Sequence, residues 1–433
     1  MIAVERRLFC SLRTAQNPAY RLARLFSISY GQSHGCLTDL SNGIGPFEPS
    51  IAFHSKSNLP TVALRSESMA GPELAIFLGA GASCSEGAPT QSSLFSDFFS
   101  TSFEGYRGLP PNDPSLQKIK TLKNGLVRFF EDFFGFDPTN PSPDAQFPTF
   151  EEALGLIDLA LSRDEAFRHF EGNLTHQQWG ATLRNIRTDF VFLIALILDK
   201  KLEHSKVKHR LLVQNLLDVA VLDKCAFLSF NYDILIDNAL EEHYDRFLDY
   251  GIQFENVGSR AENQPFTSLF KLHGSLNWLY CSSCRTCSIT KFDKGVVDIL
   301  MNPTGTHCEK CGSLRAPIII PPTYFKVLSN IFIQSVWYKA EQVLKNCRAW
   351  IFCGYSFPDA DMHVKYLLKR VQVNSAFPKV LIVNWHKDKE PRLALEEENR
   401  FRRFLGTRSK VEYKKISFEQ FAEKPTDLIK ELL

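Results

Sequence analysis

The chain has 433 residues, of which 44% are hydrophobic and 23% are charged, a composition typical of a globular protein with a sizeable core. Its 50 Lys and Arg against 48 Asp and Glu give a net charge of +2, which provides no general electrostatic reason to expect nucleic acid or a membrane surface as partner. No stretch approaches the ~18 uninterrupted apolar residues of a membrane span, so a spanning protein is excluded.

Residues 1–70 differ from the rest, and we leave them out of the fold prediction. The first 38 residues hold five Arg, several Ser and a single acid, Glu5, which is typical of a mitochondrial targeting segment. The interpretation we favour is an unstructured extension, one explanation being a start codon assigned too far upstream, since Met69 stands just before folded-looking sequence. We expect the folded domain over 71–425, in the cytoplasm, or in mitochondria if the segment is genuine.

The folded region begins with a strand and continues with helices. Leu74–Leu78 is a short apolar run that stops at Gly79-Ala80-Gly81-Ala82-Ser83, which predicts a buried strand entering a glycine turn. From about 92 to 222 apolar residues recur at i, i+3 and i+4, interrupted by Pro-rich loops. We therefore expect a large helical insertion, a lobe of its own, over this range.

Strand patterns return after the insertion. Apolar runs at 226–230, 268–272, 316–320, 349–353 and 380–383 alternate with helical patterns that include 327–346 and 359–373. Near-continuous apolar strands alternating with helices indicate a parallel sheet covered on both faces, hence an α/β, Rossmann-like fold. The charged helix Leu393–Phe404 is interpreted as a solvated face.

Three polar motifs follow apolar strands directly: the glycine turn, Asn231-Tyr232-Asp233 and His273-Gly274. Each has a plainer interpretation, because glycine turns also reverse the chain, Asn and Asp cap helices, and a lone His is more often structural. In open parallel sheets, however, ligands bind at the carboxyl ends of the strands. Together the motifs therefore predict a site at that edge, with the glycine turn suited to a diphosphate.

Five of the eleven Cys lie between 281 and 311. Cys281 with Cys284, and Cys308 with Cys311, make two CxxC units about twenty residues apart, the spacing of a tetrahedral zinc site. Cys284 with Cys287 is the alternative first pair; we favour Cys281 because it comes directly off an aromatic strand. The sequence thus predicts a closed, structural zinc module over about 278–316, in a reducing compartment.

The ordered set of motifs resembles the sirtuin family over roughly 73–390: the glycine turn, Asn-x-Asp, His-Gly, the paired CxxC units, Gly354-Tyr355-Ser356 and Val383-Asn384. It is more similar to the divergent sirtuin-like NAD hydrolases of prokaryotes than to the protein deacylases. The resemblance implies a Rossmann-like NAD-binding domain with a small zinc module, and NAD as substrate.

The family's roles carry over residue by residue. The resemblance implies that Gly79, Gly81 and Ser83, with Ala80 in the same turn, lie on the NAD phosphates. It also implies that catalytic Asn231 and Asp233 border the nicotinamide ribose and that His273 is the catalytic base. Gly354, Ser356 and Asn384 would hold the adenosine side.

Two segments and the size of the insertion depart from the deacylase pattern. Ser85–Thr90 stands where deacylases carry a Pro-Asp-Phe-Arg segment, and Pro321-Pro322-Thr323-Tyr324 stands where a Phe-Gly-Glu segment borders their peptide groove. The helical insertion is also larger than theirs. These departures argue against recognition of an acylated peptide and do not affect the expectation of NAD binding.

We therefore expect an NAD glycohydrolase that releases nicotinamide and ADP-ribose, as in a defence or stress response. A protein-lysine deacylase is the alternative, and a sensor of NAD or ADP-ribose without turnover is a third hypothesis. The sensor is disfavoured because a pure binder needs neither Asn231 nor His273. No separate sensor domain is evident after residue 390, so a trigger would act through the helical insertion, an activating partner or a homo-oligomer.

Overall fold

The computed structural model describes residues 71–432 apart from 166, 168–175, 206, 243–245, 291–296, 298–300, 302–306, 322–329 and 387–390. The extension predicted over 1–70, with its proposed targeting segment, lies outside the described residues. So do three of the four residues from 321 to 324 that depart from the deacylase pattern, since only Pro321 is described.

A seven-stranded parallel sheet confirms the predicted α/β class. Its order is β10-β9-β8-β1-β2-β4-β3. The strands are β1 (Leu74–Leu78), β2 (Cys225–Ser229), β3 (Phe247–Asp249), β4 (Phe266–Lys271), β8 (Ala349–Cys353), β9 (Lys379–Val383) and β10 (Val411–Lys414). The sequence analysis did not predict β3 and β10, which are short edge strands without a fully buried apolar run.

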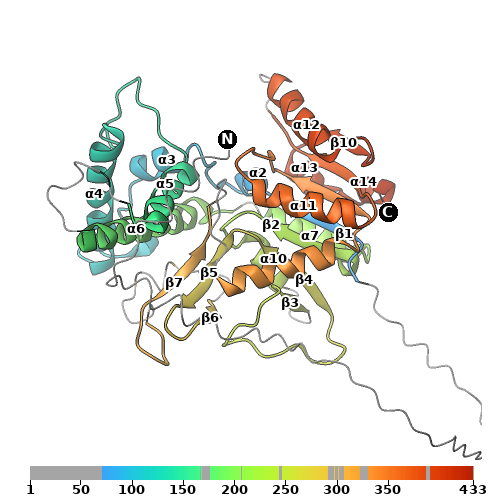
Figure 1. The fold of residues 1–433 in the computed structure, drawn as a ribbon, viewed down its shortest axis with the longest axis horizontal. Coiled ribbons are helices and arrows are strands. Elements are labelled where there is room, and N and C mark those ends of the chain that lie inside the picture. Colours follow the sequence, from blue (N-terminus) through green and yellow to red (C-terminus); the bar gives the residue numbers. More distant parts are fainter. Residues whose placement is uncertain are drawn as a thin grey trace, which may run out of the picture. The chain divides into compact units, whose positions relative to one another are not determined.

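Helices pack against the sheet in two groups (Figure 1). In one group α10 (Ile331–Leu344) contacts α11 (Met362–Asn374), and in the other α7 (Lys208–Asp218) contacts α8 (Leu235–Glu241), α13 (Phe418–Glu423) and α14 (Pro425–Leu432). α12 (Pro391–Leu405) packs beside β10. Their positions explain why the central strands are buried on both faces. None of the described helices combines the length and apolarity that a membrane crossing needs.

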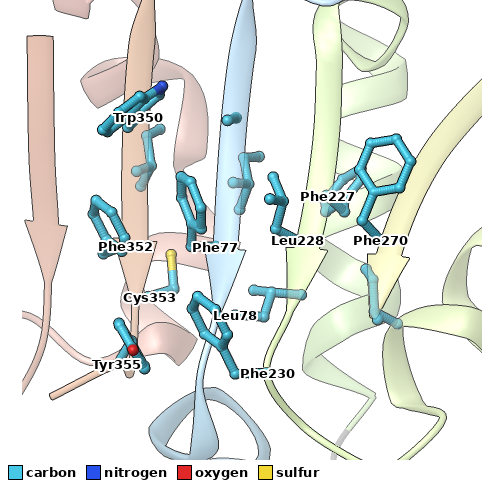
Figure 2. Packing of buried hydrophobic residues seen from close by; sticks show 14 of the residues in the cluster. Phe77, Leu78, Phe227, Leu228, Phe230, Phe270, Trp350, Phe352, Cys353 and Tyr355 are labelled. Atoms are coloured by element: carbon cyan, nitrogen blue, oxygen red, sulfur yellow. The ribbon is translucent and has the colours of Figure 1, made fainter. Parts of the chain in front are cut away.

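Aromatic side chains fill the core between neighbouring strands, as Figure 2 shows for β1, β2 and β8. Phe77 and Phe352 stack with their ring centroids 4.3 Å apart. At the strand ends, Phe230 stacks on Tyr355 at 4.1 Å. Stacked rings of this kind fix the relative positions of the loops that follow β2 and β8.

A separate lobe contains α3 (Leu94–Ser100), α4 (Pro114–Phe134), α5 (Phe150–Arg163) and α6 (His176–Leu202), with the short turn η1 (Tyr106–Gly108). Its core is a second apolar cluster rich in Phe, distinct from the core of the sheet. We call these elements the helical lobe. The insertion was expected over 92–222, but α7, within that range, buries Leu212, Val213 and Leu216 in the sheet core. The turn η2 (Leu222–Lys224) leads from there into β2.

A small antiparallel sheet, ordered β6-β5-β7, carries the cysteine-rich segment. Its strands are β5 (Gly274–Cys281), β6 (Thr286–Ile289) and β7 (Arg315–Ile319). The sequence pattern predicted that the apolar run at 316–320 forms a strand of the parallel sheet, and this prediction is wrong. Burial alone does not encode pairing direction, and β7 pairs antiparallel with β5, Gly274 opposite Ile319.

Candidate functional site

The register of the parallel sheet aligns the carboxyl ends of its central strands. Leu78 of β1 lies opposite both Ser229 of β2 and Cys353 of β8. The chain builds β2, β4 and β3 on one side of β1, and β8, β9 and β10 on the other. The topological switch therefore lies beside β1, the place where open α/β sheets bind ligands.

The predicted glycine turn consists of Gly79 followed by the short helix α2 (Ala80–Cys84), and it packs directly against the loop that follows β8. The Gly81 amide donates to the Gly354 carbonyl at 2.8 Å, and the Gly79 amide donates to Cys353 at 2.9 Å. Gly354 has φ +63°, and a Cβ there would lie 2.2 Å from the Ala82 nitrogen. These glycines thus allow a close backbone approach between two loops, because no side chain fits between them.

A cavity of about 1320 Å³ opens at this edge. Seven of the ten residues predicted to bind NAD or catalyse line it: Ala80, Gly81, Asn231, His273, Gly354, Ser356 and Asn384. The other three, Gly79, Ser83 and Asp233, lie behind the cavity wall. We call this space the strand-end cavity.

Asn231 is held by the three residues behind the wall. Its Nδ2 donates to the Gly79 carbonyl at 2.9 Å and to Ser83 Oγ at 2.8 Å, and Ser83 Oγ in turn donates to Asp233 Oδ2 at 2.6 Å. An amide nitrogen has two hydrogens. Both are used here, so Asn231 offers a reactant its oxygen, a hydrogen-bond acceptor. Asp233 also accepts from the Leu235 amide at 3.2 Å, but the N-cap position of α8 is taken by Ile234, so neither Asn231 nor Asp233 is the cap residue that the plainer interpretation expects.

His273 is buried, with 2% of its surface exposed. Its Nδ1 lies 3.1 Å from the Phe230 carbonyl oxygen, an acceptor, so Nδ1 carries the proton. Nε2 faces Asp361, whose Oδ2 is 3.5 Å away. The next residue, Gly274, has φ +83°, and a Cβ there would lie 1.9 Å from the Ile318 carbonyl oxygen. The His-Gly pair therefore depends on glycine for the turn into β5.

A buried ion pair supports β4, the strand that precedes His273. Lys271 and Asp237 are both 0% exposed, with Nζ 3.0 Å from Oδ2. Lys271 Nζ also donates to the carbonyl of Asp233, and Tyr250 donates to Asp237 at 2.8 Å. The pair thereby ties the Asn231 loop to β4.

At the opposite end, Asn384 Nδ2 donates to Glu397 Oε1 at 2.6 Å, and Tyr413 donates to the same oxygen at 3.0 Å. Glu397 lies on α12, whose predicted solvated face is wrong at this position because its side chain is 0% exposed. His386 Nε2 lies 3.3 Å from Glu397 Oε2. A buried carboxylate with these partners gives the cavity a polar end far from His273.

Sequence reasoning missed Asp361 and Glu397. The sequence pattern could have predicted the burial of Glu397, because it occupies a position of the apolar stripe of α12. The buried residues of that helix are Ala394, Glu397, Phe401 and Leu405. Asp361 had no such signal beyond its place shortly after Gly354-Tyr355-Ser356. Its neighbour Tyr355 donates to Asp361 Oδ2 at 2.7 Å.

The helical lobe contributes to the wall through Gln91 and Thr149. Thr149 caps α5, and Glu151 in the first turn of that helix is buried, with its Oε2 lacking a hydrogen-bond partner among the described residues. Burial raises the pKa of Glu151 to about 8, outweighing its hydrogen bonds with its own backbone and Gln91. This carboxyl is therefore mostly protonated at neutral pH.

The structure brings Cys281, Cys284, Cys308 and Cys311 together, with all four sulfur atoms within 4.8 Å of one another. The sulfurs of Cys281 and Cys311 are 3.6 Å apart, and those of Cys308 and Cys284 are 3.9 Å apart. Thiolates 2.3 Å from a tetrahedral zinc would be about 3.8 Å apart. The four cysteines therefore fit the predicted zinc ion, and we call them the cysteine cluster.

Cys287 lies apart from this cluster, in the core of the sheet. Burial raises the pKa of its thiol to about 12, so it stays protonated. The structure thus gathers the pairs Cys281/Cys284 and Cys308/Cys311 in preference to the alternative register.

Residues 226–404 match the family described as SIR2-like domain. The match begins at β2 and includes Asn231, His273, the cysteine cluster, Asn384 and Glu397; the glycine turn lies before it. The search of curated proteins found no match for the chain.

Proposed function

We propose that this chain, of which residues 226–404 match the SIR2-like domain family, cleaves NAD between nicotinamide and its ribose, giving nicotinamide and ADP-ribose. The domain supports an NAD-related enzyme of the sirtuin superfamily. The observation that carries the finer proposal is the convergence of Asn231 and His273 in one cavity beside the glycine turn.

The cavity suits an elongated ligand with two different ends. Its volume of about 1320 Å³ exceeds that of pockets for most small ligands. His273 follows β4 and Asn384 follows β9, which are four strand spacings apart, roughly 19 Å at ~4.8 Å each. We assign the nicotinamide ribose to the His273 end and the adenosine to the Asn384 end, with the diphosphate near Ala80 and Gly81.

The chemistry needs a base and a positioned acceptor. When the bond between C1′ and the pyridinium nitrogen breaks, nicotinamide leaves with the bonding electron pair and positive charge develops on the ribose. The water oxygen then bonds to C1′ and loses a proton. His273 Nε2 accepts the proton from the water or a ribose hydroxyl, and the Asn231 oxygen orients either one.

Water and acyl-lysine are the competing acceptors. Ser85–Thr90 stands where deacylases carry a Pro-Asp-Phe-Arg segment, so it does not support a peptide groove of their kind. Two residues of this segment, Ser85 and Thr90, line the cavity. The helical lobe brings Gln91 and Thr149 to the same wall. We therefore favour water and keep deacylation as the second candidate, since both reactions use the same two residues.

The deciding experiment incubates the purified chain with NAD alone and follows nicotinamide and ADP-ribose. Parallel samples contain an acyl-lysine peptide, and calorimetry measures NAD binding on the same preparation. Release without peptide supports the glycohydrolase. Release that strictly requires the peptide moves the function to deacylation, and binding without release in either arm indicates a sensor.

A further inference from the structure

The tautomer of His273 leaves one nitrogen for proton transfer. Because Nδ1 donates to the Phe230 carbonyl at 3.1 Å, the neutral ring presents a lone pair at Nε2. The Phe230 ring, 5.6 Å from the imidazole, and its stacking partner Tyr355 keep the orientation fixed. Any proton that His273 takes from a reactant therefore arrives at Nε2.

Asp361 stands at that nitrogen. Its Oδ2 lies 3.5 Å from Nε2, and the residue is 0% exposed although it lines the cavity. It comes from the loop between β8 and α11, whereas His273 follows β4, so the two meet only through the folding of the sheet. Tyr355 donates to Asp361 Oδ2 at 2.7 Å and fixes the carboxylate in place.

We propose that Asp361 is a positioning residue for His273: its carboxylate stabilises the imidazolium that forms when Nε2 takes the proton during NAD cleavage. The inference rests on the proposed function and adds to it a residue outside the transferred motifs. A carboxylate within about 4 Å favours the charged form of a histidine, and the low dielectric of a buried site strengthens the effect.

Three titratable groups described near this pair, Tyr232, Tyr355 and Glu151, are not charged partners for His273. Tyr232, whose ring centroid is 6.5 Å from that of His273, donates to the Ile320 carbonyl at 3.1 Å. Burial keeps the pKa of Tyr232 and Tyr355 well above 10. Glu151 on α5 is mostly protonated at neutral pH.

The remaining acid nearby, Asp233, accepts from Ser83 and from the Leu235 amide, on the side of the loop where Asn231 is anchored. The nearest cation on β4, Lys271, is paired with Asp237. Asp361, by contrast, has its Oδ2 3.5 Å from His273 Nε2.

The consequence is a specific change in the pH dependence of the rate. A base works when neutral, so kcat/KM rises with pH through the pKa of His273. Replacing Asp361 by Asn removes the charge that favours imidazolium and lowers that pKa. We expect the acidic limb of the pH profile of kcat/KM to shift to lower pH by about 1 unit. The plateau value of kcat/KM should fall ~10- to 100-fold.

The experiment compares the full chain with Asp361→Asn, Asp361→Glu and Tyr355→Phe, recording kcat/KM for NAD from pH 5 to 9 together with melting temperatures. Asp361→Glu keeps the charge and should keep the limb near its wild-type position. Tyr355→Phe removes a hydrogen bond that draws charge from the carboxylate, so the limb should move up, by roughly 0.5 pH unit. The matched control is Asp359→Asn, an exposed carboxylate two residues away that pairs with Lys365.

NMR titration of the His273 imidazole, identified by its absence in His273→Ala, measures the same coupling without turnover. A fall in the His273 pKa in Asp361→Asn with none in Asp359→Asn supports the proposal, even if wild-type protein releases no nicotinamide and the proposed function fails. A lower plateau and melting temperature with an unmoved limb and an unchanged His273 pKa overturns it and leaves Asp361 a structural residue.

Discussion

The cysteine cluster and the strand-end cavity are assembled in different ways. The cluster takes its four sulfurs from 31 residues, Cys281 to Cys311, around one small antiparallel sheet. The cavity takes its lining from Ala80 to Glu423, from loops after several parallel strands and from the helical lobe. A local assembly depends on spacing along the chain, whereas the cavity depends on the register of the whole sheet.

The two regions also differ in what stabilises their charged groups. Zinc in the cluster would need thiolates, which the metal itself stabilises. Beside the cavity, buried charged groups have protein partners: Lys271 is paired with Asp237, and Asp361 accepts a hydrogen bond from Tyr355. Removing one cysteine of the cluster should therefore release the metal ion. Removing one partner of a buried charged pair beside the cavity should leave the other charge buried without compensation.

The largest expected effect is in the cluster. Cys308→Ser should release the zinc and unfold the small sheet, because assembly of such a site is coupled to folding and structural zinc contributes on the order of 10 kcal/mol. Cys287→Ser, outside the cluster, should keep one zinc per chain. Elemental analysis and thermal melts measure both. Folded wild-type protein without zinc, or zinc lost only from Cys287→Ser, would contradict this expectation.

Next in size is the removal of the base. His273→Ala should lower kcat for nicotinamide release ~10²- to 10⁴-fold and leave NAD binding largely intact, because a base acts on the barrier. Asn231→Ala should behave alike. Kinetics and calorimetry on one preparation separate the two effects. Unchanged turnover in His273→Ala would remove the mechanism.

The helical lobe offers a test by pH. Glu151 has a pKa near 8 in the folded chain against about 4.5 in the unfolded one, so the unfolded state releases this proton first as pH rises. Its contribution to stability is present below pH 4.5 and is lost towards pH 8, at up to about 1.4 kcal/mol per pH unit. Glu151→Gln should flatten this part of the stability curve in urea unfolding at pH 5 and 8. Glu131→Gln, on an exposed face of α4, should leave the slope as in wild type.

The smallest effect concerns the glycine turn. A Cβ on Gly81 would lie 2.7 Å from Gly354 Cα, so Gly81→Ala should cost about 1–3 kcal/mol and weaken NAD binding by separating the two loops. Gly125→Ala meets open space on α4 and should stabilise by up to ~1 kcal/mol. Equal stability of Gly81→Ala and wild type would show that the close approach is unimportant.

Much of the fold could be predicted because apolar runs mark buried strands. The runs predicted at 349–353 and 380–383 coincide with β8 and β9 to within one residue. The run at 316–320 was misassigned because hydrophobicity reports burial and not the partner strand. The edge strands β3 and β10 were not predicted because they are partly exposed to solvent and lack the continuous apolar run of a buried strand.

The sequence by itself determined the order of the motifs, the α/β class and the presence of a cysteine-rich metal module, since each of these is set by residues close along the chain. The choice of Cys281 over Cys287 as a member of the cluster was favoured by the sequence and decided by the structure. The tertiary structure alone decided that Asp361 reaches His273, that Glu397 is buried, and that Ser83 and Asp233 hold Asn231 from behind. Contacts of this kind join residues up to 150 positions apart. They depend on strand register and loop packing, which no local pattern encodes.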